Sequence, residues 1–429
     1  MERDADVVVV GAGIVGCATA YFLARRGVRV VVVERGSVPG EQSRKNWGFV
    51  RQQGRDPLEL PLVMEANRLW RGLERELGAD IEWVQGGNLA LAADEKRLAR
   101  FEKWLPVARE FGLDTRLLRA RDLEAVVPGL AGAWVGGIHT PGDGHADPEK
   151  TTDAFARAAV SHGASLHLEC AVQGVTTRAG AVGSVVTEHG EIRTPTVVCA
   201  AGAWSARLAR TLGLDLPQRW VRGTVARTTP APAVTTCAVW GPGVAFRQRR
   251  DGSFTIAAGG ALDHDVTLDS LRQLRFFLPN YWKNKALFRF HVGRPLLASL
   301  AATLPGSAAR RRPLVWDRGL DPPPNPAKVR RSLVELQRVL PSLPPLGIAR
   351  SWAGYIDAAP DLVPMLGEVP PLRGFLLATG FSGHGFAMGP IAGRLVSELI
   401  LDGKSSLDIA GFRFSRFAEG AIGRPRNVL

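Results

Sequence analysis

A glycine-rich turn near the start of the chain has the residue types and the spacing needed to hold a dinucleotide. Gly11-Ala12-Gly13-Ile14-Val15-Gly16 is followed, 18 residues after its last glycine, by Glu34. The first glycine permits a tight turn, the second lets a pyrophosphate approach the backbone, and the third allows a helix to pack closely. Glu34 can accept hydrogen bonds from ribose hydroxyls, and an acid there disfavours the 2′-phosphate of NADP. An ordinary strand–helix turn would not need this acid, so the pattern indicates FAD or NAD.

A second glycine-rich turn, Thr379–Phe386, lies far along the chain and contains His384. It separates a short buried strand expected over Phe375–Ala378 from a helix expected over Ala387–Leu401. The N-terminus of a helix carries a partial positive charge. We therefore expect its N–H groups to face the N1/C2=O edge of a flavin, where they would stabilise the negatively charged reduced form.

The elements that must position these turns are those of an α/β fold. Val7–Val10 and Val28–Val33 are β-branched runs without alternation, which is typical of parallel strands buried on both faces. Asp147-Pro148 predicts the start of a helix that ends near Gly163, and the buried run Val197–Ala201 predicts a further strand of the sheet. The polar loop that follows the second strand replaces the regular strand–helix alternation of a nicotinamide dehydrogenase, which favours FAD over NAD.

Four stretches resemble the flavin-dependent family that includes D-amino-acid oxidase, glycine oxidase and the sarcosine oxidases. They are Val7–Glu34, Ser43–Arg51, Val197–Ser205 and Arg350–Gly389. In the last stretch, Trp352–Asp361 is similar to the β subunit of sarcosine oxidase and to related proline or opine dehydrogenase subunits. The W-A-G…D-x-x-P-D and G-F-S-G-H-G-F patterns are specific together and weak apart.

The resemblance implies an α/β, Rossmann-like FAD-binding domain that is discontinuous, and an α+β substrate domain with a mixed, largely antiparallel sheet. The expected FAD-binding segments are residues 1–50, 140–217 and 346–429, and the expected substrate segments are 51–139 and 218–345. The implied reaction is oxidation of a C–N bond of an amine or amino acid by hydride transfer to flavin N5, followed by imine hydrolysis. D-amino acids, N-methyl amino acids, cyclic imino acids and opines are the candidate substrates.

The motifs also predict individual site residues. Arg51 is the best-placed candidate for pairing with a substrate carboxylate, because Arg binds planar anions through two parallel hydrogen bonds. Arg55, Arg289 and Arg294 are less well placed candidates. Tyr355 is the best-placed hydroxyl among only three tyrosines, and His384 lies beside the expected flavin edge. The alternative interpretations are a solvated surface charge for Arg51, a packed core ring for Tyr355 and a structural role for His384. The predicted cofactor-binding residues are Gly11, Ala12, Gly13, Ile14, Val15, Gly16, Glu34, Arg35, Ser43, Asn46, Trp47, Gly48, Val172, Ala201, Gly202, Trp204, Gly354, Asp361, Gly380, Ser382, Gly383, His384 and Gly385.

Departures from the family pattern refine these expectations. No cysteine follows Cys237 and no histidine lies between Gly36 and Val50, so we expect noncovalent FAD. The carboxylate-binding Arg that glycine oxidase and D-amino-acid oxidase place just after the W-x-G turn is absent here, so a simple α-amino acid is not assured. The segment Ser253–Ala258 lacks the oxygen-activating Lys of monomeric sarcosine oxidases, which favours a dehydrogenase.

Composition limits the partners. The formal net charge is +13, yet the basic residues are scattered, which disfavours nucleic-acid binding. The four cysteines lie far apart, so we expect a reducing compartment and no metal site. Val7–Ala24 is uncharged, but its glycines and mixed flank argue against a membrane helix or signal peptide.

The expected location is cytoplasmic, with peripheral attachment at the inner membrane face as an alternative. Oxygen, a quinone or a partner subunit would accept the electrons. Leu271–Gly293 mixes basic and bulky apolar residues; substrate-domain core is favoured there over a docking surface, because Pro279 interrupts any long helix. The alternative functions are an FAD-bearing subunit of a larger dehydrogenase complex and, with less support, a flavin hydroxylase.

Overall fold

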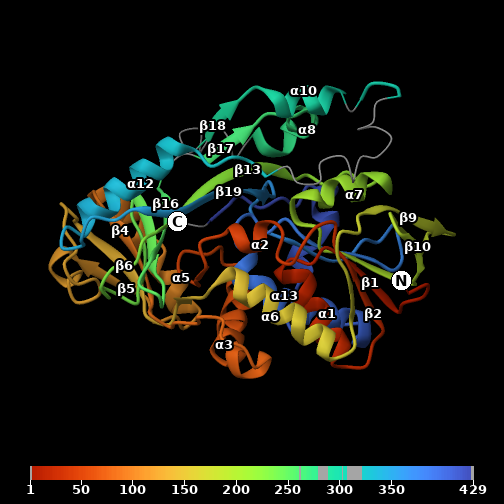
Figure 1. Ribbon diagram of the computed structural model, residues 1–429, viewed down its shortest axis with the longest axis horizontal. Helices are drawn as coiled ribbons and strands as arrows, with labels where there is room; N and C mark the ends of the chain where they lie inside the picture. Colours follow the sequence, from red (N-terminus) through yellow and green to blue (C-terminus); the bar gives the residue numbers. More distant parts are fainter. Residues whose placement is uncertain (1, 260–261, 279–287, 302, 307–320, 427–429) are drawn as a thin grey trace.

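A computed structural model describes residues 2–259, 262–278, 288–301, 303–306 and 321–426. Two sheets dominate this part of the chain, and they meet along the long strands β13 (Arg219–Thr228) and β19 (Ile348–Ala358), as Figure 1 shows. The described residues include no helix long and apolar enough to cross a membrane.

The first sheet is six-stranded and mainly parallel, with the order β20-β21-β12-β1-β2-β8. Only β20 runs antiparallel to its neighbour β21. The strands are β1 (Val7–Val10), β2 (Val30–Val33), β8 (Ser165–His167), β12 (Thr196–Cys199), β20 (Met365–Glu368) and β21 (Phe375–Thr379).

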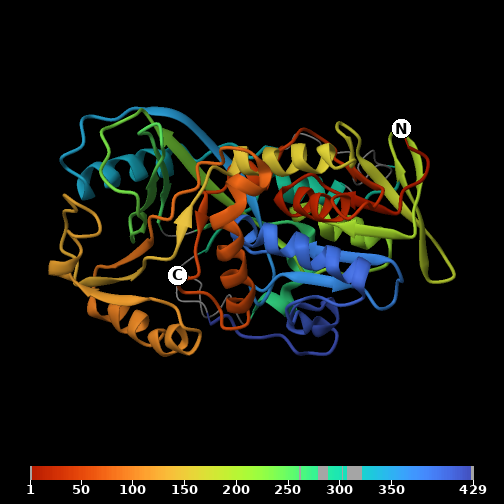
Figure 2. The ribbon, with the colours of Figure 1, turned by 90° about the horizontal axis from the view of Figure 1, so that it is seen from below.

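Both faces of this sheet are buried, which explains the unbroken valine runs. Val7 and Val9 of β1 join one hydrophobic cluster, while Val8 and Val10 join another on the opposite face. The first cluster includes helices α1 (Ile14–Ala24), α13 (Gly385–Asp402) and α6 (Pro148–Ser161). Figure 2 shows α1 and α13 side by side. The second face is covered in part by the three-stranded sheet of β9 (Val172–Arg178), β10 (Ala181–Thr187) and β11 (Gly190–Arg193).

The predicted local elements agree with these bounds. Asp147 caps α6 by accepting a hydrogen bond from the backbone N–H of Lys150, and Gly403 ends α13 in the left-handed conformation. The stretch Leu166–Val175 contains the end of β8 and the start of β9. The first glycine-rich turn joins β1 to α1 as predicted.

The second sheet is ten-stranded, mixed and largely antiparallel, as the family resemblance implied. Its main order is β18-β17-β13-β16-β15-β14-β4-β6-β5, and β19 pairs along β13. The other strands are β4 (Asn88–Ala92), β5 (Arg116–Arg119), β6 (Gly136–Thr140), β14 (Ala238–Trp240), β15 (Val244–Gln248), β16 (Phe254–Ala258), β17 (Leu262–Asp265) and β18 (Phe288–His291).

Three helices matter most around this sheet. Helix α12 (Pro326–Val339) covers one face, with Val329 and Leu336 in the same cluster as Phe246 of β15. Helix α4 (Glu95–Glu102) packs on β4 and β6, and α3 (Leu60–Leu77) contacts α13 of the other half. Strand β19 lies inside the segment predicted for the FAD-binding domain but pairs with β13 in the ten-stranded sheet. The division into domains remains a prediction.

Candidate active site

A cavity of about 680 Å³ lies where the two sheets meet. The ends of β1, β2 and β12, the segment around α2 (Gln42–Lys45), strands β13 and β19 and the start of α13 all contribute to its wall. Arg51, Tyr355 and His384 line it. So do the predicted cofactor-binding residues Gly11, Ala12, Gly13, Ile14, Val15, Glu34, Arg35, Ser43, Asn46, Trp47, Val172, Ala201, Gly202, Trp204, Gly354, Ser382, Gly383, His384 and Gly385.

The first turn has no room for side chains on two of its glycines. Gly11 has a φ of +103°, and a Cβ on it would lie 2.6 Å from the carbonyl oxygen of Ala200 on the neighbouring strand end. A Cβ on Gly16 would overlap the carbonyl oxygen of Gly11, so Gly16 packs the helix against the turn and does not line the cavity. Gly13 precedes α1, has no side chain with which to cap the helix, and lines the cavity. The turn therefore presents backbone rather than side chains to a ligand.

Glu34 follows β2 and forms hydrogen bonds that hold this turn in place. Its Oε2 accepts a hydrogen bond from the backbone N–H of Ala12 at 2.8 Å, and its Oε1 accepts one from Gly36 at 2.8 Å. Burial raises the pKa of Glu34, and the two N–H groups act in the opposite direction. The carboxylate thus lies at the cavity wall, where the sequence pattern expects a ribose.

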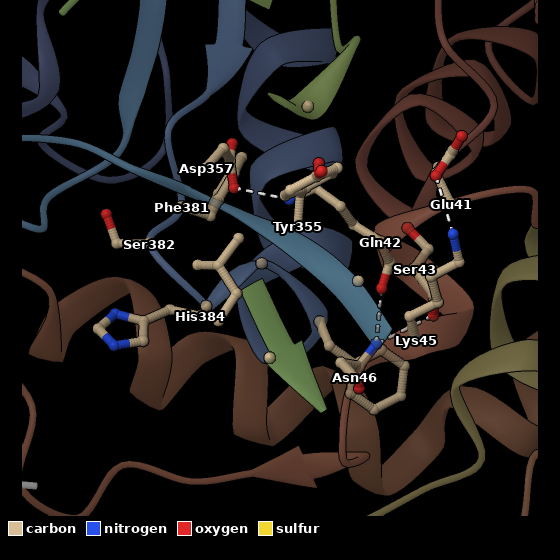
Figure 3. Close-up of a pocket in the computed structure, with 18 of the residues that line it drawn as sticks. Glu41, Gln42, Ser43, Lys45, Asn46, Tyr355, Asp357, Phe381, Ser382 and His384 are labelled. Atoms are coloured by element: carbon tan, nitrogen blue, oxygen red, sulfur yellow. Dashed lines mark hydrogen bonds and ion pairs between the residues drawn. The ribbon is translucent and has the colours of Figure 1, made fainter. Parts of the chain in front are cut away.

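A polar network joins the loop after β2 to the ends of β19 and β12. Gln42 donates from Nε2 to Asp357 Oδ1 at 2.9 Å and accepts at Oε1 from the Ala203 N–H at 2.7 Å. Ser43 Oγ accepts from the Ile14 N–H in the first turn of α1 at 2.8 Å. Figure 3 shows Gln42 and Asp357 facing each other beside Tyr355. This network holds together segments more than 300 residues apart in the sequence.

Gly380 and Gly48, both predicted to bind the cofactor, do not line the cavity. The N–H of Gly380 donates to Asp357 Oδ2 at 2.8 Å, so Gly380 ties β21 to β19. Gly48 has a φ of +82°, and a Cβ there would overlap the carbonyl oxygen of Ala146. It also lies against Arg247, whose Nε donates to the Trp47 carbonyl at 2.7 Å. Both glycines permit close packing behind the cavity wall.

Asp361 is also displaced from the cavity. Its carboxylate pairs with Arg416 through Nε at 2.9 Å and Nη2 at 3.1 Å, and each residue is no more than 3% exposed. The D-x-x-P-D pattern therefore places one acid, Asp357, in the network beside the cavity and turns the other toward the C-terminal segment.

The second glycine-rich turn leads helix α13 into the cavity wall. Ser382 and Gly383 have φ values of +54° and +88°, and His384 is the residue before the helix. Ser382, Gly383, His384 and Gly385 line the cavity. The first N–H groups of a helix lack acceptors within the helix, so this wall offers donors to a ligand.

Arg51 and Arg55 are buried beside each other and both line the cavity. Arg51 donates from Nη1 to the Gln53 carbonyl at 2.6 Å, and its guanidinium lies 5.6 Å from the ring centre of Trp240. Burial lowers the pKa of Arg51 well below its usual range, and the charge of Arg55 adds to this effect. Arg55 Nη1 is buried and has no hydrogen-bond partner in the described part of the chain. These guanidinium groups are suited to bind an anion.

His384 and Tyr355 occupy different parts of the wall. His384 Nδ1 lies 3.0 Å from Glu59 Oε1, and its ring points away from Tyr355 in Figure 3. Burial and the charge of Arg55 lower the pKa of His384 to about 4, so the ring is neutral at pH 7. Tyr355 packs against Trp220 with ring centres 4.9 Å apart. Sequence reasoning missed Glu59 and Gln42, because neither belongs to a motif.

The described residues contain no group of three or more His, Cys, Asp or Glu side chains placed to hold a metal ion. All four cysteines are buried and unpaired. His145, which precedes α6 in the sequence, is buried and belongs to no such group. Its Nε2 lies 3.0 Å from the Thr236 carbonyl oxygen.

The fold and cavity are those of an FAD-dependent oxidoreductase. Residues 6–399 match the family described as DAO, FAD dependent oxidoreductase, and the chain belongs to this family. The resemblance and the fold class predicted from the sequence are therefore confirmed. The tight glycine turn, the acid at the end of β2 and the N-terminus of α13 in the cavity wall fit the FAD that the family uses.

Similar proteins give the same class. Mitochondrial sarcosine dehydrogenase of Mus musculus is 27% identical over 97% of this chain and 42% of its own length. The chain thus spans less than half of that relative. Glycine oxidase of Geobacillus kaustophilus is 27% identical over 97% of this chain and 98% of its own. The structure of L-amino acid deaminase from Proteus vulgaris has a TM-score of 0.90 at 27% identity and covers 97% of this chain and 98% of its own.

Proposed function

We propose that this protein oxidises the C–N bond of an amino acid whose carboxylate is bound by Arg51 and Arg55. D-amino acids, N-methyl amino acids, cyclic imino acids and opines are the candidate substrates. The observation that carries the proposal is the position of two buried guanidinium groups in the wall of the cavity that also contains the glycine turn. Proteins named for the oxidation or deamination of amino acids are among those similar to this chain.

The predicted cofactor-binding residues that line the cavity would hold FAD without a covalent bond. When bound, FAD supplies an acceptor for the hydride that leaves the carbon next to nitrogen. The guanidinium groups of Arg51 and Arg55 orient the carboxylate, so that positioning is the main contribution of the protein. His384 holds its proton at Nδ1 toward Glu59, which leaves Nε2 as a hydrogen-bond acceptor. Tyr355 is the proposed hydroxyl donor in the cavity.

A dehydrogenase that passes electrons to a quinone or a partner subunit is favoured over an oxidase. The end of β16 that reaches the cavity carries Ala258 and Gly259 rather than a lysine. The proposed location is the cytoplasm, which agrees with the four unpaired thiols. The alternative of an FAD-bearing subunit predicts that no substrate reduces the flavin unless a partner is present.

Anaerobic flavin reduction tests the proposal. Each candidate amino acid would be paired with the matching amine that lacks the carboxylate, and absorbance of the oxidised flavin would be followed. We expect reduction by carboxylated substrates only. In a separate aerobic turnover assay, we expect oxygen consumption to be slower than reduction of a quinone or dye. Equal reduction by the paired amines would contradict the carboxylate site.

The variant Arg51→Gln would test the assigned residue. Its kcat/KM for carboxylated substrates should fall at least about 100-fold, because a buried charge pair is lost. Arg121→Gln is the matched control, since the side chain of Arg121 is 87% exposed. Unchanged kcat/KM in Arg51→Gln would remove Arg51 from the binding site.

A further inference from the structure

An outer layer of the molecule extends from the free edge of the ten-stranded sheet. We define it as residues 268–278, 288–301 and 303–306, which include α8 (Leu268–Arg272), β18 and α10 (Arg294–Ala301). Strand β18 is the last strand in the order of this sheet, and α10 contacts α8. Figure 1 shows these elements together, on the side of β13 opposite to α3 and α6.

Large apolar side chains of the described residues are exposed mainly in this outer layer. Val292 is 75% exposed and Leu297 is 66% exposed. Helix α10 has the sequence Arg-Pro-Leu-Leu-Ala-Ser-Leu-Ala, yet none of its residues is buried. Exposed apolar side chains that gather in one part of a surface are typical of interaction sites, whereas singly scattered ones are ordinary surface. The exposed large apolar residues of the layer are Leu271, Leu274, Leu278, Phe290, Val292, Leu297, Leu300 and Leu304.

Apart from Asp269, the charged residues of the outer layer are basic. From Ser270 to Gly306 the sequence contains no Asp or Glu. Arg289 and Arg294 are exposed and make no ion pair within the described part of the chain. Asp269 pairs with Arg210 at 2.9 Å and with Arg272 at 3.6 Å, so it does not compensate Arg289 or Arg294. The layer therefore combines exposed hydrocarbon with uncompensated positive charge.

We propose that the outer layer docks onto the surface of an anionic lipid bilayer. Apolar side chains would enter the boundary between headgroups and acyl chains, and the arginines would contact lipid phosphates. A second copy of this chain is a poorer occupant, because a two-fold interface brings the same basic residues together. The proposal stands on exposure and charge alone and does not depend on the proposed function.

Docking would also bring the cavity near the bilayer. Strand β17 pairs with β13 at Arg222 and Asp263, and Val221, Gly223 and Val225 of β13 line the cavity. Strand β17 therefore lies between β18 of the outer layer and β13 of the cavity wall. An electron acceptor dissolved in the membrane would be close to this position.

Co-sedimentation of the FAD-loaded full chain with lipid vesicles tests the proposal. One set of vesicles contains phosphatidylcholine alone, and the other contains phosphatidylcholine with phosphatidylglycerol. We expect binding to the anionic vesicles, much weaker binding to the neutral ones, and a decrease with added salt. Failure to bind anionic vesicles, or equal binding to both sets, overturns the proposal.

Variants locate the surface. Arg289→Glu with Arg294→Glu, and separately Val292→Glu with Leu297→Glu, should each lower the partition coefficient by about tenfold or more. Val334→Glu is the matched control, because Val334 is 61% exposed on α12, outside the layer. Flavin content and far-UV circular dichroism would verify folding. An equal loss in Val334→Glu overturns the proposal. So does a lipid-free oligomer that the Val292→Glu, Leu297→Glu variant dissociates.

Discussion

The imidazole of His384 and the carboxylate of Glu59 lie 3.0 Å apart, from Nδ1 to Oε1, although 325 positions separate them in the sequence. His384 precedes α13 and Glu59 precedes α3, so the contact joins the starts of two helices. The two helices also meet where Trp70 Nε1 donates to the Ala387 carbonyl at 2.9 Å. Glu59 thereby fixes the ring that lines the cavity.

Removal of the Glu59 carboxylate should slow flavin reduction without abolishing it. Glu59→Ala releases the ring and should lower the reduction rate constant by about 10–100-fold, as for other residues that orient a functional histidine. Glu59→Gln keeps an acceptor for the Nδ1–H and should retain more of the rate. Stopped-flow reduction at several pH values measures both, with Glu149→Ala as control, because Glu149 is exposed on α6. A wild-type rate in Glu59→Ala would show that the contact is only structural.

Gly16→Ala should prevent stable FAD binding. The added Cβ would overlap the carbonyl oxygen of Gly11, so the turn must open. The ratio of flavin to protein absorbance in the purified variant measures the loss. Gly72→Ala is the control, because nothing lies within 4 Å of its added Cβ on α3; it should increase the free energy of unfolding by about 0.5–1 kcal/mol. Full flavin content in Gly16→Ala would contradict the assignment of the turn.

Asp361→Asn should destabilise the protein rather than weaken its affinity for FAD. It leaves the buried Arg416 guanidinium without its charged partner, which typically costs about 3–5 kcal/mol. Denaturant unfolding measures this loss, and fluorescence titration measures the Kd for FAD of the folded fraction. If the Kd rises while stability is unchanged, Asp361 would be a cofactor residue, as the sequence pattern predicted.

The pH dependence of stability should reflect His145. Burial and the charge of Arg247 lower the pKa of His145 to about 3, compared with 6.5 for the ordinary group. Between these pH values the unfolded chain therefore binds a proton at His145 that the folded chain does not bind. The contribution of this group to the free energy of unfolding keeps its full value above pH 6.5 and decreases as the pH falls toward 3. Within that window the free energy of unfolding should fall by about 1.4 kcal/mol per pH unit from this group.

His384, with its pKa lowered to about 4, contributes in the same direction. The difference between wild type and His145→Gln isolates the His145 contribution. The curve of the variant should be flatter between pH 6.5 and 5 in denaturant titrations at fixed ionic strength. Parallel curves would mean that the pKa of His145 is the same in the folded and unfolded states.

The FAD should be released by acid. No cysteine or histidine is found where covalent members of the family attach their flavin, and no cysteine lines the cavity. After precipitation with trichloroacetic acid, the yellow colour is expected in the supernatant. Colour that remains in the washed pellet would demonstrate a covalent bond.

Local structure was readily predicted where it depends on neighbours in the sequence. The valine run of β1 implied burial on both faces, and Asp147-Pro148 implied the start of α6; both are confirmed. The two glycine-rich turns were found because tight turns and close backbone approaches demand glycine. Each of these signals results from steric and hydrogen-bonding requirements that act within a few residues.

Pairings between distant side chains had no such signal. Nothing in the sequence around Glu59 indicates His384, and nothing around Asp361 indicates Arg416. The spacing of a motif does not indicate toward which side of a turn each carboxylate points, so Asp361 was predicted to bind the cofactor and Asp357 was not. Strand β19 belongs to the ten-stranded sheet because it pairs with β13 along its length in the antiparallel direction.

The amino-acid sequence by itself thus determined the family, the dinucleotide turn and the use of FAD. Only the tertiary structure decided which residues line the cavity, which ones support it from behind, and which apolar side chains remain exposed. The reason is physical: turns and helix starts are set by local backbone geometry, whereas burial and long-range pairing are properties of the packed chain as a whole.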